Sequence, residues 1–256
     1  MSRRYAFIIQ ARTGSTRFHN KILLPFYNSK TILDLQLENI QKYFPGALII
    51  IATTTNKADD VIVDKYTSWG KLSVYRGDEN NVLKRFVDTA NAFGVENIVR
   101  ICSDNPFLSM DYCAQMINSY FENTTDYLSY KFSNGTPAIR SHSGLFGEIV
   151  SLKALEKVLK STAELLYLEH VTNYIYTHPN AYKLDFILVP DFVDSYIDTL
   201  RLTIDTQVDF TNLQKLYLAV LQNYGEGYTI EQLLSEVDGN VELVKIMTEQ
   251  IRQYGK

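Results

Sequence analysis

The sequence predicts an α/β protein whose mostly parallel sheet is covered by helices on both faces. Apolar runs rich in Ile and Val are typical of buried strands, and they lie at residues 5–11, 47–53 and 97–102. Amphipathic stretches alternate with these runs, at residues 31–44, 58–69 and 81–93. Alternation of strand and helix indicates parallel strands joined by crossover helices. Ligands bind such sheets beyond the carboxyl ends of the strands, so the loops that follow the three runs are the first candidates for a site.

The helix predicted over residues 31–44 has a clear start signal. Thr31 is a suitable N-cap, because its hydroxyl can accept a hydrogen bond from a backbone N–H of the first turn. Apolar residues follow at near-helical spacing, namely Ile32, Leu33, Leu35, Leu37 and Ile40. The stretches 58–69 and 81–93 are predicted to be further helices, each followed by a short strand.

The alternation changes after residue 126. Turn signals such as Asn134-Gly135 predict a hairpin-like inserted β arm over residues 127–151. Helical periodicity returns at 152–159 and 163–176, strands are predicted at 183–189 and 200–204, and three helical stretches end the chain, with a C-terminal helical part over about 226–256. No internal repeat or low-complexity linker divides the chain, so we predict one domain over residues 1–256.

Composition limits the class of protein. Hydrophobic residues make up 46% and charged residues 21% of the chain, as in ordinary globular proteins. No apolar run approaches the roughly 18 residues of a membrane-spanning helix, and the N-terminal run lacks the length and cleavage site of a signal peptide. Cys102 and Cys113 form neither a metal-site spacing nor a disulfide framework. We therefore expect a cytoplasmic protein that does not bind membranes.

The charge distribution indicates a small anionic ligand. The net charge of -4 argues against a nucleic-acid-binding protein, which would need a basic surface. Residues 1–33 nevertheless carry six basic side chains and no Asp or Glu, whereas the rest of the chain has 19 basic and 29 acidic residues. This asymmetry favours a local anion site, with chance as the alternative.

The strongest signal is the stretch 8–21, IIQARTGSTRFHNK. A buried strand ends in a polar loop with a glycine, hydroxyl residues and three basic residues, Arg12, Arg17 and Lys21. Such a loop can turn its N–H groups toward an anion while the cations neutralise it. It matches neither the Walker A loop nor Gly-x-Gly-x-x-Gly. From the residues alone, a phosphate site and a solvated surface loop both remain open.

The same stretch resembles the N-terminal signature of the cytidylyltransferase family that includes CMP-ketodeoxyoctonate and CMP-sialate synthetases, and it is most similar to the spore-coat-polysaccharide type. Members of that family typically read Ala-Arg-x-x-Ser-x-Arg-x-Pro-Gly-Lys. The matching positions are Ala11, Arg12, Ser15, Arg17 and Lys21, and His19-Asn20 replaces Pro-Gly. The resemblance implies that these residues bind the nucleotide, together with the backbone N–H groups of Gly14 and Ser15, and that Lys21, Arg12 and Asp104 are catalytic.

Two aspartates follow later strands. Asp104 lies in RICSDNP, where the family shows Asp-x-Pro, and Asp205 lies in RLTIDT, which resembles the family's Arg-Leu-Thr-Val-Asp-Thr. Mg²⁺ usually takes one or two carboxylates together with substrate phosphates and water. The resemblance therefore implies that Asp104 and Asp205 bind Mg²⁺. A turn or helix-cap role is the alternative for each.

Less specific matches complete the resemblance. The segment 75–86, YRGDENNVLKRF, resembles a family segment in which Arg76 or Arg85 could face phosphate or base, and we assign Arg76 to the nucleotide. Glu148 matches a family Glu in the arm and is assigned to the substrate, with a structural role as the alternative. His170, in the run Glu-His-Val-Thr, is a candidate interior or interface histidine, with a catalytic role as the alternative.

The resemblance implies a Rossmann-like three-layer α/β/α fold of the nucleotide-diphosphosugar-transferase kind, and a homodimer. It also implies a Mg²⁺-dependent enzyme that transfers CMP from CTP to a sugar or sugar-acid acceptor and releases pyrophosphate, in surface polysaccharide biosynthesis. Two alternatives are a glycosyltransferase that uses a nucleotide sugar on the same fold and a nucleotide-binding protein without activity. Ser103-Asp104-Asn105 is not the Asp-x-Asp motif that such a glycosyltransferase would usually carry.

Overall fold

The computed structural model describes residues 5–15, 17–123 and 125–255. Seven strands form one sheet: β1 Tyr5–Gln10, β2 Leu48–Thr54, β3 Ser73–Gly77, β4 Asn97–Cys102, β5 Tyr127–Lys131, β6 Glu148–Ser151 and β7 Leu184–Leu188. The α-helices of the described residues are α1 Ile32–Tyr43, α2 Asp60–Thr67, α3 Val82–Phe93, α4 Met110–Glu122, α5 Leu152–Ser161, α6 Leu165–Glu169, α7 Asn173–Thr177, α8 Asp191–Asp194, α9 Gln207–Tyr224, α10 Ile230–Asp238 and α11 Val241–Gln253.

The sheet is mostly parallel in its first half and mixed in its second. Its strand order is β3-β2-β1-β4-β6-β5-β7. Strands β3, β2, β1 and β4 are parallel, whereas β6 is antiparallel to both β4 and β5, and β7 is parallel to β5. The predicted α/β fold with a mostly parallel sheet is confirmed.

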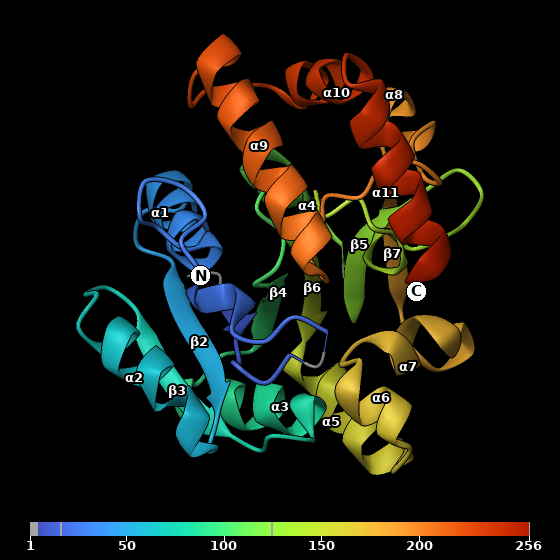
Figure 1. Ribbon diagram of the computed structural model, residues 1–256. Coiled ribbons are helices and arrows are strands. Elements are labelled where there is room, and N and C mark those ends of the chain that lie inside the picture. The colour runs from blue at the N-terminus through green and yellow to red at the C-terminus, as the bar shows by residue number, and fades with distance from the viewer. Residues whose placement is uncertain (1–4, 16, 124, 256) are drawn as a thin grey trace.

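Helices cover both faces of the sheet, as Figure 1 shows. One core packs α1, α4 and α9 to α11 against one face, and a second core packs α3, α5 and α7 against the other. Alternate residues of β1 belong to different cores, with Phe7 in the first and Ile8 in the second. Because both faces are buried, the strand is a continuous apolar run rather than an alternating one.

Capping side chains determine where three of the helices begin. Thr31 caps α1 with a capping box, since its side chain accepts from the Asp34 N–H and the Asp34 side chain accepts from the Thr31 N–H. Thr206 caps α9 in the same way with Asp209. The helix predicted over 81–93 begins after Asn81, whose side chain accepts from the Lys84 N–H.

The segment 127–151 contributes its two ends to the sheet. Strands β5 and β6 pair antiparallel, as a hairpin would, and residues 132–147 form the connection between them. The homodimer that the resemblance implies stays a prediction.

Two predicted elements were wrong. Residues 200–204 are buried but form no strand, because the Leu202 and Ile204 N–H groups donate to the isolated carbonyls of His142 and Asp104 rather than to a ladder. The helix predicted over 163–176 is interrupted at residues 170–172, which separate α6 from α7. Thr172 at that interruption donates to the buried carboxylate of Glu148, a tertiary contact that outweighs the local helical pattern.

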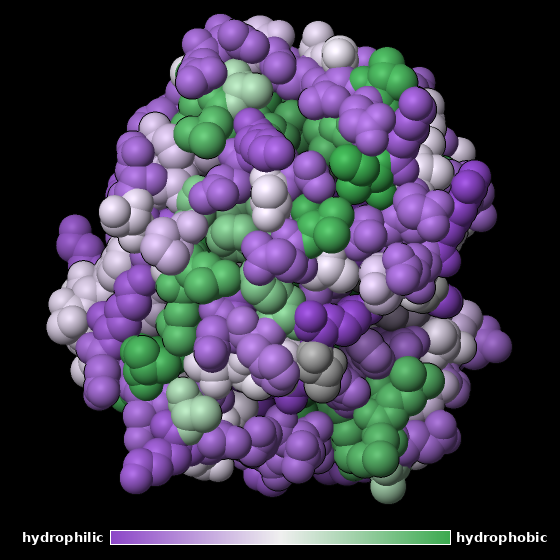
Figure 2. Space-filling view, viewed as in Figure 1, coloured by the Kyte–Doolittle hydropathy of each residue, from purple (hydrophilic) through white to green (hydrophobic). Residues whose placement is uncertain are grey.

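The surface is mixed, as Figure 2 shows, with apolar side chains gathered over α6 at the lower right. Leu165 and Leu166 of that helix are 77% and 52% exposed. Within the described part of the chain, no helix has the length and apolar content required to span a membrane.

Candidate active site

Two neighbouring parallel strands bring the predicted site segments together. Gln10 at the end of β1 is in register with Cys102 at the end of β4. The chain therefore leaves both strands at the same edge of the sheet, and the loop that carries Arg12 lies beside the loop that carries Asp104.

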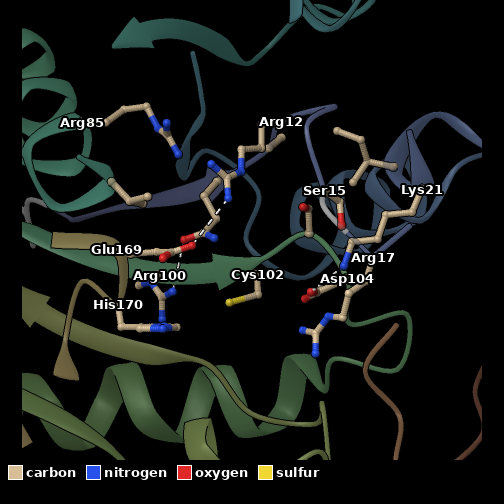
Figure 3. Close-up of a pocket in the computed structure, with 15 residues that line it drawn as sticks. Arg12, Ser15, Arg17, Lys21, Arg85, Arg100, Cys102, Asp104, Glu169 and His170 are labelled. Atoms are coloured by element: carbon tan, nitrogen blue, oxygen red, sulfur yellow. Dashed lines mark hydrogen bonds and ion pairs between the residues drawn. The ribbon is translucent and has the colours of Figure 1, made fainter. Parts of the chain in front are cut away.

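A hollow of about 250 Å³ opens between these loops, and Figure 3 shows the side chains that line it. Lys21, Ser15, Arg17 and Asp104 lie at one end, and Cys102 lies near the middle. The other end holds Arg12, Arg85, Arg100, Glu169 and His170. Among the described lining residues, five Arg or Lys side chains face two carboxylates, so the hollow suits a polyanion.

A buried carboxylate fixes the N-terminal loop. The Thr13 N–H and the Thr13 hydroxyl both donate to Asp59 Oδ1, at 2.7 Å each, and Thr54 donates to the other oxygen. Asp59 is 2% exposed. Sequence reasoning missed this residue, because an Asp at the start of a helix is indistinguishable from an ordinary cap.

The loop closes with a short helical turn that presents Lys21. The turn is a 3₁₀ helix over Lys21–Leu23, and Asn20 before it has φ 56°. Asn adopts this left-handed conformation more readily than most residues, which explains how Asn20 can stand where the family signature has Gly. Lys21 Nζ then donates to Asp104 Oδ2 at 3.0 Å and to the carbonyl oxygen of Ile204.

Asp205 is held by two arginines. Arg17 Nη2 lies 3.0 Å from Asp205 Oδ1, and Arg201 Nη2 lies 3.1 Å from Asp205 Oδ2. The Ile204 N–H donates to the Asp104 carbonyl at 3.0 Å, which ties the two aspartate segments together. Lys21, Asp104 and Asp205 therefore lie on one side of the molecule.

A buried ion pair between Arg201 and Asp209 lies next to Asp205 and holds it. Arg201 donates to both carboxylate oxygens of Asp209, at 2.7 and 2.9 Å, and to His142 Nδ1 at 2.8 Å. Burial by itself raises the pKa of Asp209, but the Arg201 guanidinium and the N–H groups of Asp205 and Thr206 outweigh it and hold that pKa below its usual value. Asp209 is thus a fixed anion.

A second cluster of buried polar side chains links the neighbouring strands β4 and β6. Arg100, on β4, pairs with Glu148, on β6, at 2.5 Å and also donates to Gln10 Oε1 at 3.1 Å. Glu148 accepts further hydrogen bonds from Tyr127 at 2.5 Å and Thr172 at 2.9 Å. Arg100 lines the hollow, whereas Glu148 is 1% exposed and lies behind it. An arginine within an apolar strand is the sequence signal that could have revealed this pair, because a buried charge requires a partner.

Arg85 is the least compensated cation of the hollow. It is 1% exposed, its Nη1 donates to the Asp78 carbonyl at 2.7 Å, and its Nε has no partner among the described residues. Burial and the nearby charge of Arg12 lower the pKa of Arg85 to about 10. Arg12 itself lies 3.6 Å from Glu169 Oε1. An anion in the hollow would neutralise both guanidinium groups.

The predicted site residues fall into two groups. Those that line the hollow are Ala11, Arg12, Ser15, Arg17, Lys21 and Asp104. Gly14, Arg76, Glu148 and Asp205 do not line it. Arg76 donates to the carbonyls of Thr54 and Asn56 at 2.9 and 2.8 Å and pairs with Asp60, which joins the ends of β2 and β3. The roles of all these residues stay predictions.

Asp104 and Asp205 together offer two carboxylate groups as ligands for a metal ion. Within the described ranges, no group of three or more His, Cys, Asp or Glu side chains is arranged to hold a metal ion. Two carboxylates are nevertheless what Mg²⁺ takes from a protein when substrate phosphates and water complete its coordination. The pair therefore fits a metal that binds together with a nucleotide.

Comparison with known proteins places the chain among transferases. A family model described as cytidylyltransferase matches residues 6–239. The spore coat polysaccharide biosynthesis protein SpsF of Bacillus subtilis (strain 168) is 33% identical over 215 residues, which cover 82% of this chain and 85% of that protein.

Solved structures agree with this match. A cytidylyltransferase from Leptospira borgpetersenii has a TM-score of 0.80 and 26% identity, with 94% of this chain and 96% of that chain covered. A CMP:2-keto-3-deoxy-manno-octonic acid synthetase solved with CTP has a TM-score of 0.60 and 12% identity, with 84% of this chain and 99% of that chain covered. The second likeness concerns the fold alone.

Proposed function

The chain belongs to the cytidylyltransferase family, and from this premise we propose that it transfers CMP from CTP to a sugar or sugar-acid acceptor and releases pyrophosphate. The convergence of Lys21 with Asp104 and of Arg17 with Asp205 carries this proposal. Lys21 and Asp104 are 83 residues apart in the sequence, and Arg17 and Asp205 are 188 residues apart. The two pairs therefore join the cationic loop to two distant acids. A site for a triphosphate and a divalent cation requires that combination of charges.

The reaction is a substitution at the α-phosphorus. An oxygen of the acceptor forms a bond to that phosphorus, the bond to the β-phosphate oxygen breaks, and the acceptor hydroxyl loses its proton. Arg12, Arg17 and Lys21 bind the triphosphate and offset the charge on the departing pyrophosphate. Catalysis of this kind rests on positioning and charge neutralisation, since no covalent intermediate with the protein is needed.

Asp104 and Asp205 would hold Mg²⁺ in this site. The ion would neutralise phosphate charge and lower the pKa of the acceptor hydroxyl. Each aspartate is paired with a cation in the structure, Asp104 with Lys21 and Asp205 with Arg17 and Arg201. We propose that binding exchanges these partners, so that Lys21 and Arg17 turn to phosphate oxygens.

Surface polysaccharide biosynthesis is the pathway that we propose, because the relative from Bacillus subtilis carries that name. A cytoplasmic location and a homodimer remain predictions of the same kind.

Pyrophosphate release tests the function directly. The purified chain is mixed with each of the four NTPs, Mg²⁺ and a panel of sugars and sugar acids, and both pyrophosphate and a CMP-linked product are measured. Formation of both with CTP supports the proposal. Use of a nucleotide sugar with release of the nucleoside diphosphate would instead support the glycosyltransferase alternative, and CTP binding without turnover over the whole panel would support the binding protein.

A further inference from the structure

The last helix of the chain reaches the proposed site, although it lies beyond the residues matched by the family model, 6–239. Helix α11 spans Val241–Gln253, at the red end of the chain in Figure 1. Gln250 Oε1 accepts from the Thr206 hydroxyl at 3.0 Å, and Thr206 directly follows Asp205. The ring of Tyr254 lies 5.9 Å from the guanidinium carbon of Arg17. Helix α11 and Tyr254 therefore contact the residue after Asp205 and approach the side chain of Arg17.

The core fixes the position of this helix. Leu243 and Met247 are 5% and 3% exposed and belong to the same core as α9. Asn240 caps the helix by accepting from the Leu243 N–H at 3.0 Å. Tyr254 is the C-cap residue directly after this helix, and its N–H donates to the Gln250 carbonyl at 2.9 Å. The backbone of Tyr254 is thus tied to a packed helix.

The ion pair with Asp205 alone fixes the position of the Arg17 guanidinium only weakly. Its side chain is 48% exposed, and its ion pair with Asp205, at 3.0 Å, joins a long flexible side chain to a carboxylate. An exposed ion pair of this kind holds its geometry weakly. Phe18, the next residue, is anchored by an edge-on contact with Phe210 of α9, with ring centroids 5.6 Å apart. The backbone at Arg17 is therefore held, while its guanidinium depends on Asp205 and on the Tyr254 ring.

We propose that Tyr254 is a positioning residue for Arg17. The electron-rich face of its ring attracts the guanidinium and keeps it at the edge of the hollow, from which it can turn from Asp205 to the triphosphate. The C-terminal helix then helps to position a residue of the site, in addition to packing against the rest of the protein. This inference rests on the proposed function insofar as it concerns CTP, whereas the proximity of Tyr254 and Arg17 is a property of the fold.

The test is a double-mutant cycle between Arg17 and Tyr254, read from the Kd of CTP and from the KM and kcat of the reaction. Tyr254→Leu should weaken CTP binding about two- to fivefold, as expected for a partly exposed cation–π contact, with a smaller effect on kcat. Tyr254→Phe keeps the ring and should restore wild-type binding. Tyr224→Leu is the matched control, because Tyr224 is a partly exposed tyrosine at the end of another helix, α9.

The cycle distinguishes positioning from general packing. In an Arg17→Ala background, Tyr254→Leu should have no further effect on CTP binding, since the guanidinium that it holds is gone. An equal loss in both backgrounds, or wild-type CTP binding by Tyr254→Leu, would overturn the inference. The same cycle is also read from thermal unfolding of the ligand-free variants, where a coupling between the two residues is expected. If the wild-type chain binds no CTP, the proposed function fails, and the unfolding cycle still decides whether Tyr254 holds Arg17.

Discussion

Arg201 and Asp209 form a buried two-pronged ion pair directly beneath Asp205, with N–O distances of 2.7 and 2.9 Å. The second Asp209 oxygen also accepts from the backbone N–H groups of Asp205 and Thr206, at 2.9 and 2.8 Å. One carboxylate therefore fixes both the backbone that carries the proposed metal ligand and the arginine that pairs with its side chain. The orientation of Asp205 depends on a residue that never enters the hollow.

We predict that Asp209→Asn both destabilises the protein and impairs the site. The change leaves the buried Arg201 without its closest counter-charge, so the free energy of unfolding should fall by about 3 kcal/mol. Chemical denaturation measures this loss. Asp198→Asn, at an exposed aspartate, serves as the control and should stay within about 0.5 kcal/mol of wild type. Equal stability of the two variants would contradict the role given to the pair.

The same pair predicts a dependence of stability on pH. The pKa of Asp209 is lower in the folded chain than in the unfolded chain, where an aspartate has a pKa of about 4. Its contribution is therefore complete above that value and is lost as the pH falls through the lower, folded pKa. The stability advantage of wild type over Asp209→Asn should shrink in that acidic range. An advantage that stays constant down to the acid transition would refute the assignment.

Asp104→Asn should abolish most turnover without unfolding the chain. Its carboxylate lies 3.0 Å from Lys21 Nζ and is partly exposed, so stability should change little. Loss of a charge that stabilises the transition state costs on the order of a hundredfold in kcat. Pyrophosphate release over a range of Mg²⁺ concentrations measures the effect, with Asp111→Asn at the exposed start of α4 as the control. Full Mg²⁺-dependent turnover by Asp104→Asn would remove this residue from the mechanism.

Arg85→Met should separate stability from binding. The buried guanidinium has no carboxylate partner among the described residues, so a neutral side chain of similar length should leave the melting temperature of the ligand-free protein equal or higher. CTP affinity should fall about tenfold or more, because a charged hydrogen-bond donor is lost. Calorimetry and thermal unfolding measure both quantities. The exposed Arg140→Met is the control, and wild-type CTP affinity in Arg85→Met would argue against an anion at this end of the hollow.

Glu148→Gln tests whether that residue has a structural or a substrate role. Arg100 would lose its buried counter-charge, and the free energy of unfolding should fall by about 3–5 kcal/mol. The exposed Glu242→Gln should behave as wild type. A Glu148→Gln variant with wild-type stability but a much higher KM for the acceptor would favour the substrate role predicted from the sequence.

Much of the fold was predictable because its signals are local. The continuous apolar runs at β1, β2 and β4 and the cap at Thr31 depend on neighbours within a few residues. The segment 200–204 was mispredicted as a strand for the same reason, because it has the apolar residues of a strand but no neighbouring ladder to pair with. The apolar content of a segment predicts that it is buried, but the segment forms a strand only where its backbone pairs with a neighbouring strand.

The sequence by itself determined the cations of the loop from Arg12 to Lys21 and the two aspartates after apolar segments, since side-chain chemistry is visible at any position. Only the tertiary structure decided which charges meet. The register of β1 against β4 sets the loop that carries Arg12 beside the loop that carries Asp104, and the packing of α11 brings the Tyr254 ring near the Arg17 guanidinium. It also buried Asp59, Asp209 and Glu148 and left them outside the lining of the hollow. These contacts join residues far apart in the chain, and their energies depend on burial and distance, which no local pattern encodes.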